Sequence, residues 1–266
     1  MSIYQAVSVI RHLLTSWNSA GVRTSSPFYY SLIHPVVGAD HQQELTKASE
    51  RLRDEMLNDR RLIRVTDLGT GGWGSRERRV CNIASKAAVS PRQGALLARI
   101  AASEMSDIPA SGGVVIELWT SLGISTLCLT EAAPQNRIIT VEGCPILTKL
   151  AKENFLRHGY GDIEQINADF SSALQKLKEE GTKIRFAYID GNHTGEALRE
   201  YFKTILEMAA GEITIVADDI HLTRSMYKGW KMIRCYQGAQ LSIETLHFGL
   251  VFRKQSLISG SFRIRC

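Results

Sequence analysis

The stretch Val114–Leu129, VVIELWTSLGISTLCL, constrains the fold more than any other part of the chain. Its apolar first residues predict a strand over Val114–Leu118, the small residues Thr120–Gly123 predict a turn, and apolar spacing from Ile124 predicts a helix. A buried strand that turns into a helix N-terminus binds nucleotide-like ligands at the carboxyl edge of a parallel sheet. Such a turn needs small residues so that the backbone can approach the ligand. Trp119 is the exception, because it stands where glycine is expected.

Length and composition set the outer limits. The 266 residues, 44% of them hydrophobic, suffice for one large α/β domain with an appendage. The net charge of +5 permits an acidic or nucleic-acid partner without requiring one. Five cysteines without a C-x-x-C pair predict reduced thiols and neither disulfides nor a zinc site. The N-terminus lacks a secretory pattern and no apolar run approaches the ~20 residues of a membrane span, so we expect a cytoplasmic protein.

Residues 1–90 are predicted to form a helical extension that acts as a lid. Apolar residues at helical spacing predict one helix over 3–17 and a second, highly charged helix over Gln42–Arg60. Between them lies the aromatic, proline-containing stretch Pro27–Pro35. It has two interpretations: it packs against the main domain, or it forms a wall of the substrate site.

The run Ile63–Gly74, IRVTDLGTGGWG, looks like a second glycine-rich nucleotide-binding turn. The basic run Ser75–Arg79 follows it, however, where a nucleotide-binding unit would have an apolar helix. A glycine motif without a strand before it and a helix after it is weak evidence. We therefore predict a hairpin or lid with a basic tip.

Strands and helices alternate from Val114 onward, after two further predicted helices at Val80–Ala88 and Pro91–Met105. This alternation predicts right-handed crossovers and a parallel sheet covered on both faces. The strands Leu241–Leu246 and Phe248–Arg253 lie close together as in an antiparallel hairpin, and Phe262–Arg265 is a last short strand. The expected parallel strands are Val114–Leu118, Arg137–Glu142, Ile163–Asn167, Phe186–Asp190 and Ile213–Asp218, and the expected helices between and after them are Ser125–Ala133, Pro145–His158, Ser171–Glu180, Gly195–Ala209 and Leu222–Tyr236.

Acidic or polar residues stand at the ends of all five parallel strands. A parallel sheet brings these ends to one edge, where ligands bind in open α/β sheets. Glu142, about 25 residues past Glu117, suits an acid that accepts the two hydroxyl groups of a ribose. Asp169 is placed to face an adenine amino group.

Two acid–histidine runs, Asp190–His193 and Asp218–His221, form a second group at this edge. The converging carboxylates would repel one another unless they shared a hard cation such as Mg²⁺ or Ca²⁺. Alternatively, they fix a histidine as a general base. His193 and His221 each follow their acid by two or three residues, which places them on loops above the sheet.

The motifs together resemble those of the class I S-adenosylmethionine-dependent methyltransferases over about residues 91–255. Within that family the chain looks most like the small-molecule O-methyltransferase branch and a bacterial subgroup of unassigned substrate. The matching runs are I-E-L-x-T-S-x-G-x-S-T at Ile116–Thr126, TVEG at 140–143, NADF at 167–170, YIDGNH at 188–193 and VADDIH at 216–221.

This resemblance implies a Rossmann-like three-layer α/β/α fold over 91–266, with a seven-stranded, mostly parallel sheet and a C-terminal antiparallel hairpin. It also implies S-adenosylmethionine as cofactor and a small-molecule acceptor. The implied cofactor-binding residues are Gln93, Glu117, Trp119, Thr120, Ser121, Gly123, Ser125, Glu142, Gly143, Asp169, Phe170 and Asp190. Metal-dependent members bind Mg²⁺ with acids that correspond to Asp190, Asp218 and Asp219, and the candidate catalytic residues are His193, His221 and Asp190.

Trp119 departs from the family pattern, which has glycine beside the methionine and ribose portions of the cofactor. There are three alternative placements of the indole: it fills the site, it swings into the protein and remodels the pocket, or it caps a face of the adenosine. The competing functions are methylation of RNA or protein, which would use the basic residues Arg76–Arg79, and a non-catalytic binding role. The chain lacks the Asn/Asp-Pro-Pro-aromatic motif of amino-group methylation. The sequence is compatible with a homodimer and does not favour nucleic acid as a partner.

Overall fold

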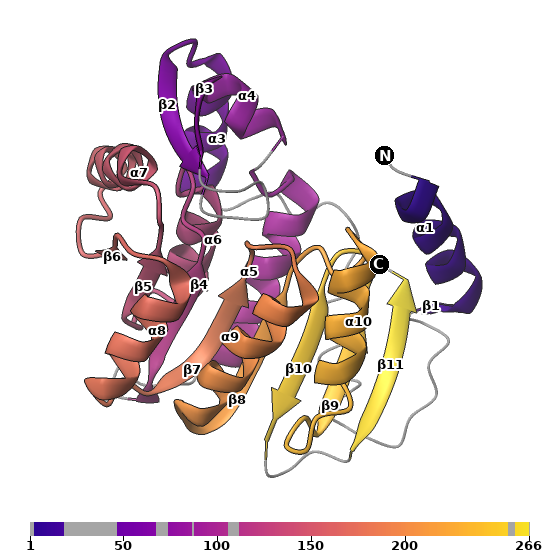
Figure 1. Ribbon diagram of the computed structural model, residues 1–266. Helices are drawn as coiled ribbons and strands as arrows, with labels where there is room; N and C mark the ends of the chain where they lie inside the picture. The colour runs from indigo at the N-terminus through magenta and orange to yellow at the C-terminus, as the bar shows by residue number, and fades with distance from the viewer. Residues whose placement is uncertain are drawn as a thin grey trace.

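The computed structural model describes residues 3–18, 47–67, 74–86, 88–105, 112–254 and 259–265 (Figure 1). No described helix is long and apolar enough to cross a membrane. The helices are α1 (Ile3–Thr15), α3 (Lys47–Asn58), α4 (Val80–Lys86), α5 (Pro91–Met105), α6 (Ile124–Ala132), α7 (Pro145–Arg157), α8 (Phe170–Glu179), α9 (Gly195–Glu207) and α10 (Arg224–Ile233). The strands are β1 (Trp17–Asn18), β2 (Leu62–Asp67), β3 (Gly74–Arg79), β4 (Val114–Leu118), β5 (Ile138–Val141), β6 (Glu164–Ile166), β7 (Ile184–Ile189), β8 (Ala209–Ala217), β9 (Leu241–Glu244), β10 (Gly249–Arg253) and β11 (Gly260–Arg265).

The described strands build a central sheet in the order β1-β11-β9-β10-β8-β7-β4-β5-β6. Strands β6, β5, β4, β7 and β8 are parallel, and β10 is antiparallel to both β8 and β9. The predicted Rossmann-like fold is therefore confirmed. Two more strands extend it, because β11 pairs in parallel with β9 and β1 pairs in parallel with β11. The end of the predicted first helix is thus a strand instead, since Trp17 and Asn18 pair with β11.

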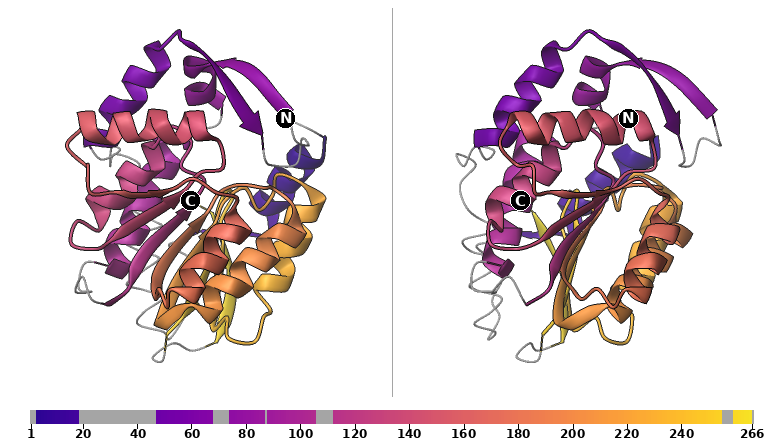
Figure 2. Two further views of the ribbon diagram at one scale, coloured as in Figure 1. Left: turned by 60° about the vertical axis from the view of Figure 1, so that its left-hand side comes forward. Right: turned by 90° about the vertical axis from the view of Figure 1, so that its left-hand side faces the viewer.

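Helices cover both faces of this sheet (Figure 2). Neighbouring residues of one strand alternate between two apolar clusters, because successive side chains of a strand point to opposite faces. In β4, for example, Ile116 packs with α8, α9 and α10, whereas Val115 packs with α5 and α6. The near-continuous apolar strands are what a sheet buried on both faces requires.

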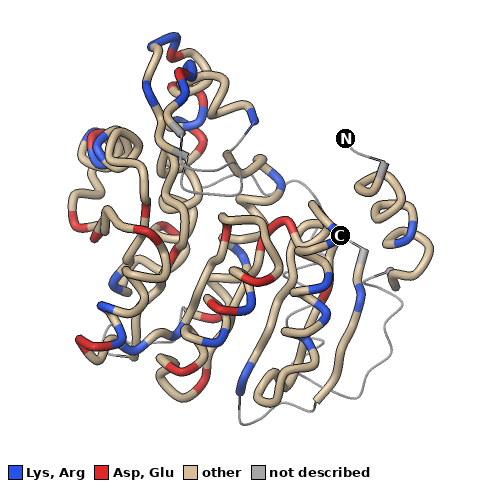
Figure 3. Tube along the Cα trace, viewed as in Figure 1, with Lys and Arg blue, Asp and Glu red and all other residues tan. Residues whose placement is uncertain are grey.

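The predicted N-terminal extension packs in two separate places. Helix α1 lies beside β11, whereas α3, α4 and β2 pack on α6 and α7 through a third apolar cluster. The predicted hairpin is present, because β2 pairs antiparallel to β3, but the basic run Ser75–Arg79 lies within strand β3 and not at the tip. Figure 3 shows basic residues in this part of the chain. Pro27–Pro35, residues 42–46 and the glycine-rich run 68–73 lie outside the described residues. The domain boundary at residue 90 stays a prediction.

A close backbone approach between α9 and α10 yields a stability prediction. A Cβ atom at Gly229 would lie 2.7 Å from Gly195 Cα, and backbone cannot move aside as a flexible side chain can. Overpacking of this kind costs about 1–3 kcal/mol. We expect Gly229→Ala to lower the free energy of unfolding by that amount in urea denaturation. Alanine at the adjacent, exposed Lys228 should change it by less than about 0.5 kcal/mol; equal effects would contradict the close approach.

Candidate functional site

The turn after β4 has an unusual backbone. Trp119 has φ +94°, Ser121 +47° and Gly123 +88°. The left-handed region costs a residue with a side chain about 1–2 kcal/mol, so other contacts must hold the turn in place. Strand β5 supplies some of these contacts, since the N–H groups of Trp119 and Thr120 both donate to the carbonyl of Val141, at 2.9 and 3.2 Å. Gly123 also has a packing role, because a Cβ there would lie 2.4 Å from the Phe155 ring.

The side chain of Trp119 points toward the loop after β7. A Cβ built on Gly191 would lie 3.3 Å from Trp119 Cβ and 2.8 Å from the Phe170 ring, so glycine is needed at 191. The Trp119 and His193 ring centroids are 5.8 Å apart, and the indole is half-buried. The indole thus packs toward the β7 loop, and which of the three alternatives applies to the cofactor stays a prediction.

Glu142 joins the β4 turn to the start of α7. Its Oε2 accepts the Ser121 N–H at 2.9 Å and its Oε1 accepts the Cys144 N–H at 2.8 Å. Burial raises the pKa of Glu142, and the N–H groups of Cys144, Ser121 and the adjacent Gly143 act in the opposite direction. Each carboxylate oxygen has a second lone pair. Glu142 can therefore accept further hydrogen bonds without releasing the turn.

Glu117 lies beneath the turn and is fully buried. Its Oε2 accepts hydrogen bonds from the hydroxyl groups of Thr126 at 2.5 Å and Thr140 at 2.7 Å. Burial raises its pKa to about 7, against the hydrogen bonds from Ser125, Thr126 and Thr140. In this structure Glu117 supports the turn from the inside of the sheet. The Thr120 hydroxyl lies 2.6 Å from that of Thr140 and extends the same network.

Three other predicted residues cap helices or pack beside the turn. Asp169 is the N-cap of α8 and accepts the Ser172 N–H at 2.9 Å, which lowers its pKa. Phe170, the next residue, packs against Gly191. Gln93 stands in the first turn of α5, where its Oε1 accepts the Ser90 N–H at 3.2 Å. Because the carboxylate of Asp169 is exposed, it can also contact a ligand.

The acids after β7 and β8 are organised by Tyr188. Its hydroxyl donates to Asp218 Oδ2 at 2.5 Å and lies 3.4 Å from Asp190 Oδ2. Burial and the charge of Asp218 raise the pKa of Asp190 well above its usual range, and burial and the charge of Asp219 raise that of Asp218 to about 7. Sequence reasoning missed Tyr188, although it stands two residues before Asp190 and so on the same side of the strand.

The three predicted magnesium ligands are not brought together. Among the described residues, the one group of such ligand atoms that lies within 4.8 Å of one another is His12, His221 and Glu244. The oxygens of Asp190, Asp218 and Asp219 do not form such a group, and Tyr188 binds two of these acids. A Mg²⁺ site at these acids stays a prediction.

The two candidate histidines occupy different places. His193 lies beside Trp119, where burial lowers its pKa and the charge of Asp219 raises it. His221 instead stacks on Tyr227, with ring centroids 5.1 Å apart, and its Nε2 lies 3.6 Å from Glu244 Oε1. Burial lowers its pKa to about 4. Of the two, His193 remains a candidate base at the cofactor edge.

The positive φ of Trp119 reverses the usual order of stability between an alanine and a glycine variant. Alanine is normally more stable than glycine at an ordered position, but at φ +94° its Cβ is strained. We expect Trp119→Gly to be more stable than Trp119→Ala by about 1 kcal/mol in urea denaturation. At Lys228, inside α10, the same pair should show the opposite order by about 1 kcal/mol. Alanine more stable than glycine at both positions would contradict the assigned backbone.

Glu117 makes stability depend on pH. Its pKa is about 7 in the folded protein and about 4.5 in the unfolded chain, so between these values the folded state keeps a proton that the unfolded state has released. Stability from this residue therefore falls as pH rises through that window. Between pH 5.5 and 8 the loss is on the order of 2 kcal/mol. We expect Glu117→Gln to remove this loss in urea denaturation, whereas Glu153→Gln, an exposed change, should keep it.

Comparisons with known proteins agree with this architecture. Residues 116–220, less than half of the chain, match the model of a methyltransferase domain. A methyltransferase of Podospora anserina, bound to S-adenosylhomocysteine, is 14% identical over 88% of this chain and 98% of its own, with a TM-score of 0.58. An O-methyltransferase of Streptomyces achromogenes involved in tomaymycin synthesis, in complex with S-adenosylmethionine, is 18% identical over 92% and 97%, with a TM-score of 0.55.

A third solved structure is shorter. The O-methyltransferase of Bacillus cereus, in complex with S-adenosylhomocysteine, is 19% identical over 62% of this chain and 81% of its own, with a TM-score of 0.51. No curated protein sequence matches the chain. The resemblance that the motifs indicate is thus confirmed: the chain has the class I methyltransferase fold, and residues 116–220 carry the sequence pattern of a methyltransferase domain.

Proposed function

We propose that this protein is an S-adenosylmethionine-dependent methyltransferase that methylates a hydroxyl oxygen of a small molecule. The observation that carries the proposal is the shared edge of β5, β4, β7 and β8, which holds the turn Trp119–Gly123, the carboxylate of Glu142 and the pair His193–Asp219. Solved O-methyltransferases of the same fold, bound to this cofactor or its product, support the reading.

Two unpartnered polar atoms support a ligand at this edge. Ser121 Oγ and His193 Nδ1 are buried and have no hydrogen-bond partner among the described residues. Leaving a buried polar group unpaired costs about 1–3 kcal/mol, and such groups are rare in folded proteins. Ser121 is in the cofactor turn and His193 is in the loop beside it. A bound ligand with hydrogen-bonding groups would satisfy both.

The residues of this chain would divide the work of binding. Glu142 would accept the ribose hydroxyl groups with its remaining lone pairs. Asp169 would receive the adenine amino group, and the turn Thr120–Gly123 would contact the methionine end. Trp119, turned toward Gly191, would line the reaction side of the site. The bound cofactor supplies a sulfonium methyl group that an acceptor oxygen displaces.

His193 is the proposed base. Burial lowers its pKa, so the ring is neutral near pH 7 and can take the proton of the acceptor hydroxyl. Asp219 would stabilise the imidazolium that results, because its charge raises the pKa of the same ring. Asp190 and Asp218 would stay protonated or share the hydroxyl proton of Tyr188, which limits repulsion at the edge. The roles given to these residues do not depend on a metal.

A nucleic-acid acceptor is the alternative from another class of substrate. Ser75–Arg79 is exposed along β3, in the small β2–β3 sheet, and presents three arginine side chains. Arg79 already donates to the Arg60 carbonyl at 3.0 Å, and Arg76 and Arg78 alternate with Glu77. This mixed pattern favours a solvated surface over a phosphate-binding groove. The small-molecule reading is therefore preferred.

Cofactor binding tests the proposal. We expect S-adenosylhomocysteine to bind the protein with micromolar affinity in calorimetric titration. Glu142→Gln should weaken binding by 10-fold to 100-fold, because hydrogen bonds to a charged acceptor contribute about 1.5–3 kcal/mol. Glu153→Gln, an exposed change on α7, should leave it unaltered.

The outcomes separate the alternatives. No binding to the native protein, together with binding to Trp119→Gly, would show that the indole closes the site and would overturn the proposed activity. Binding without methyl transfer to any small hydroxyl compound, but with transfer to RNA, would favour the nucleic-acid reading.

A further inference from the structure

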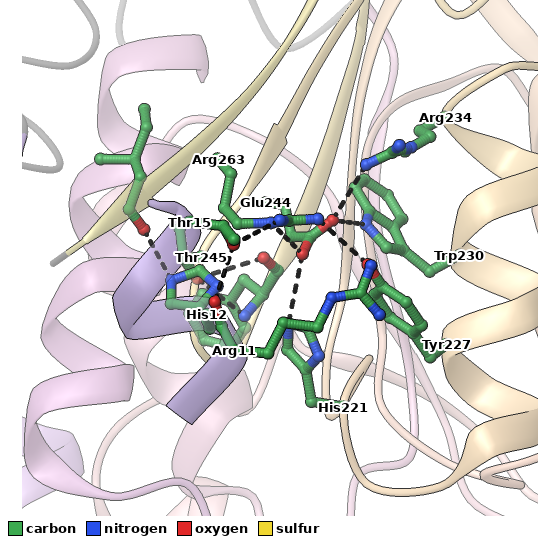
Figure 4. Close-up of polar contacts among 12 residues, drawn as sticks. Arg11, His12, Thr15, His221, Tyr227, Trp230, Arg234, Glu244, Thr245 and Arg263 are labelled. Carbon is green, nitrogen blue, oxygen red and sulfur yellow. Dashed lines mark hydrogen bonds and ion pairs between the residues drawn. The ribbon is translucent and has the colours of Figure 1, made fainter. Parts of the chain in front are cut away.

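The geometry points to a transition-metal site formed by His12, His221 and Glu244, where α1 meets the sheet (Figure 4). One ligand atom from each residue lies within 4.8 Å of the other two. The His221 Nε2 and Glu244 Oε1 atoms are 3.6 Å apart. Tetrahedral zinc with bonds of about 2.0–2.1 Å separates its ligands by about 3.3 Å, so a small inward shift closes the set. This site is independent of the proposed methyl transfer.

The hydrogen bonds around the three residues prepare them as ligands. His12 Nε2 lies 3.0 Å from the carbonyl of Ile264, which can only accept, so Nε2 carries the proton of the neutral ring. The lone pair of His12 is therefore on Nδ1. His221 has a hydrogen bond to the backbone at Thr245, and its Nε2 faces Glu244. Histidine ligands of metals are oriented by such a bond from the second ring nitrogen.

Glu244 is held in one orientation. Its Oε2 accepts from Trp230 Nε1 at 2.9 Å and from Arg234 at 3.2 Å, and its Oε1 accepts from Arg263 Nε at 2.7 Å. The residue is only 1% exposed. Hydrogen bonds to a ligating carboxylate are typical of metal sites. They leave one lone pair of Oε1 to face the two imidazole rings.

The space beside these ligands is small. The cavity bordered by the three ligand residues and by Ser8, Arg11, Tyr227 and Arg263 has room for about one water-sized guest. A metal ion fits such a space. Two imidazole nitrogens and one carboxylate are the donors that zinc binds in open, three-ligand sites, with a fourth position for water. We therefore commit to Zn²⁺ or a similar borderline ion, not to Mg²⁺ or Ca²⁺.

Positive charge nearby limits the affinity. Arg234 and Arg263 pair with Glu244, and Arg11 lies over the Tyr227 ring at 5.5 Å. These guanidinium groups repel a divalent cation, so we expect micromolar binding. An anionic fourth ligand beside Arg11 would offset part of that repulsion.

Metal binding would fasten three distant parts of the chain together. His12 is in α1, His221 is in the loop before α10, and Glu244 ends β9. In the described structure α1 otherwise contacts the body chiefly through β11. Bound metal should therefore protect the amides of α1 from hydrogen exchange.

The test uses the untagged full chain after treatment with chelator. We expect Co²⁺ to bind one per chain with the visible absorption bands of a tetrahedral site, and Zn²⁺ to displace it. His12→Ala and His221→Ala should each weaken binding at least tenfold. His158→Ala, a change directly after α7, which lies far from α1 in Figure 1, should leave it unaltered. His12 is in the peripheral α1, so its variant keeps the core intact.

Three results would overturn the inference. The first is no stoichiometric binding of Co²⁺ or Zn²⁺ at 100 µM, a concentration on the order of ten times the expected dissociation constant. The second is equal affinity in both histidine variants and the native protein. The third is stabilisation of α1 by chloride or phosphate, and not by metal, in a way that needs Arg11; this would assign the cavity to an anion.

Discussion

The carboxylate of Glu142 is the contact on which the ligand edge depends. It accepts one N–H group from the turn after β4 and one from the start of α7, and so fixes two loops on neighbouring strands. The Val141 carbonyl adds the hydrogen bonds that hold Trp119 and Thr120. Without these bonds the turn would relax, because Trp119 and Ser121 both have positive φ. The strain at Trp119 is thus maintained by β5 and not by the indole.

Tyr188 connects the acids at the same edge. Tyr188 donates its hydroxyl proton to Asp218 and lies near Asp190, and burial raises the pKa of both acids. Asp219 acts on the acids and on the histidine alike: its N–H donates to Asp218 Oδ1 at 2.7 Å, and its charge raises the pKa values of Asp190, Asp218 and His193. The three acids, Tyr188 and His193 therefore form one electrostatically connected group, in which Asp219 is the counter-charge of the proposed base.

Local sequence patterns predicted the fold well, and the prediction failed where an element depends on long-range contacts. The strand–turn–helix of Val114–Leu129 and the alternation after it were read correctly, because apolar period and small-residue turns are local signals. Strand β1 was missed, since two residues at the end of an amphipathic helix become a strand only by pairing with β11. The basic run Ser75–Arg79 was placed at a tip for the same reason: its pairing with β2 is not visible in its composition.

The sequence predicted which residues stand at the candidate site better than it predicted the contacts that their side chains make. Glu142 and Asp169 stand where strand ends placed them, but His221 turns away to Glu244, a residue more than twenty positions later in the chain. Side-chain direction depends on packing with α1 and β11, which no motif encodes. The most direct test of the account is a crystal structure grown with S-adenosylhomocysteine. We predict adenosine between Glu142 and Asp169, with Trp119 still at positive φ beside Gly191 and His193. An indole that lies in the ligand's place, or a ligand bound elsewhere, would contradict it.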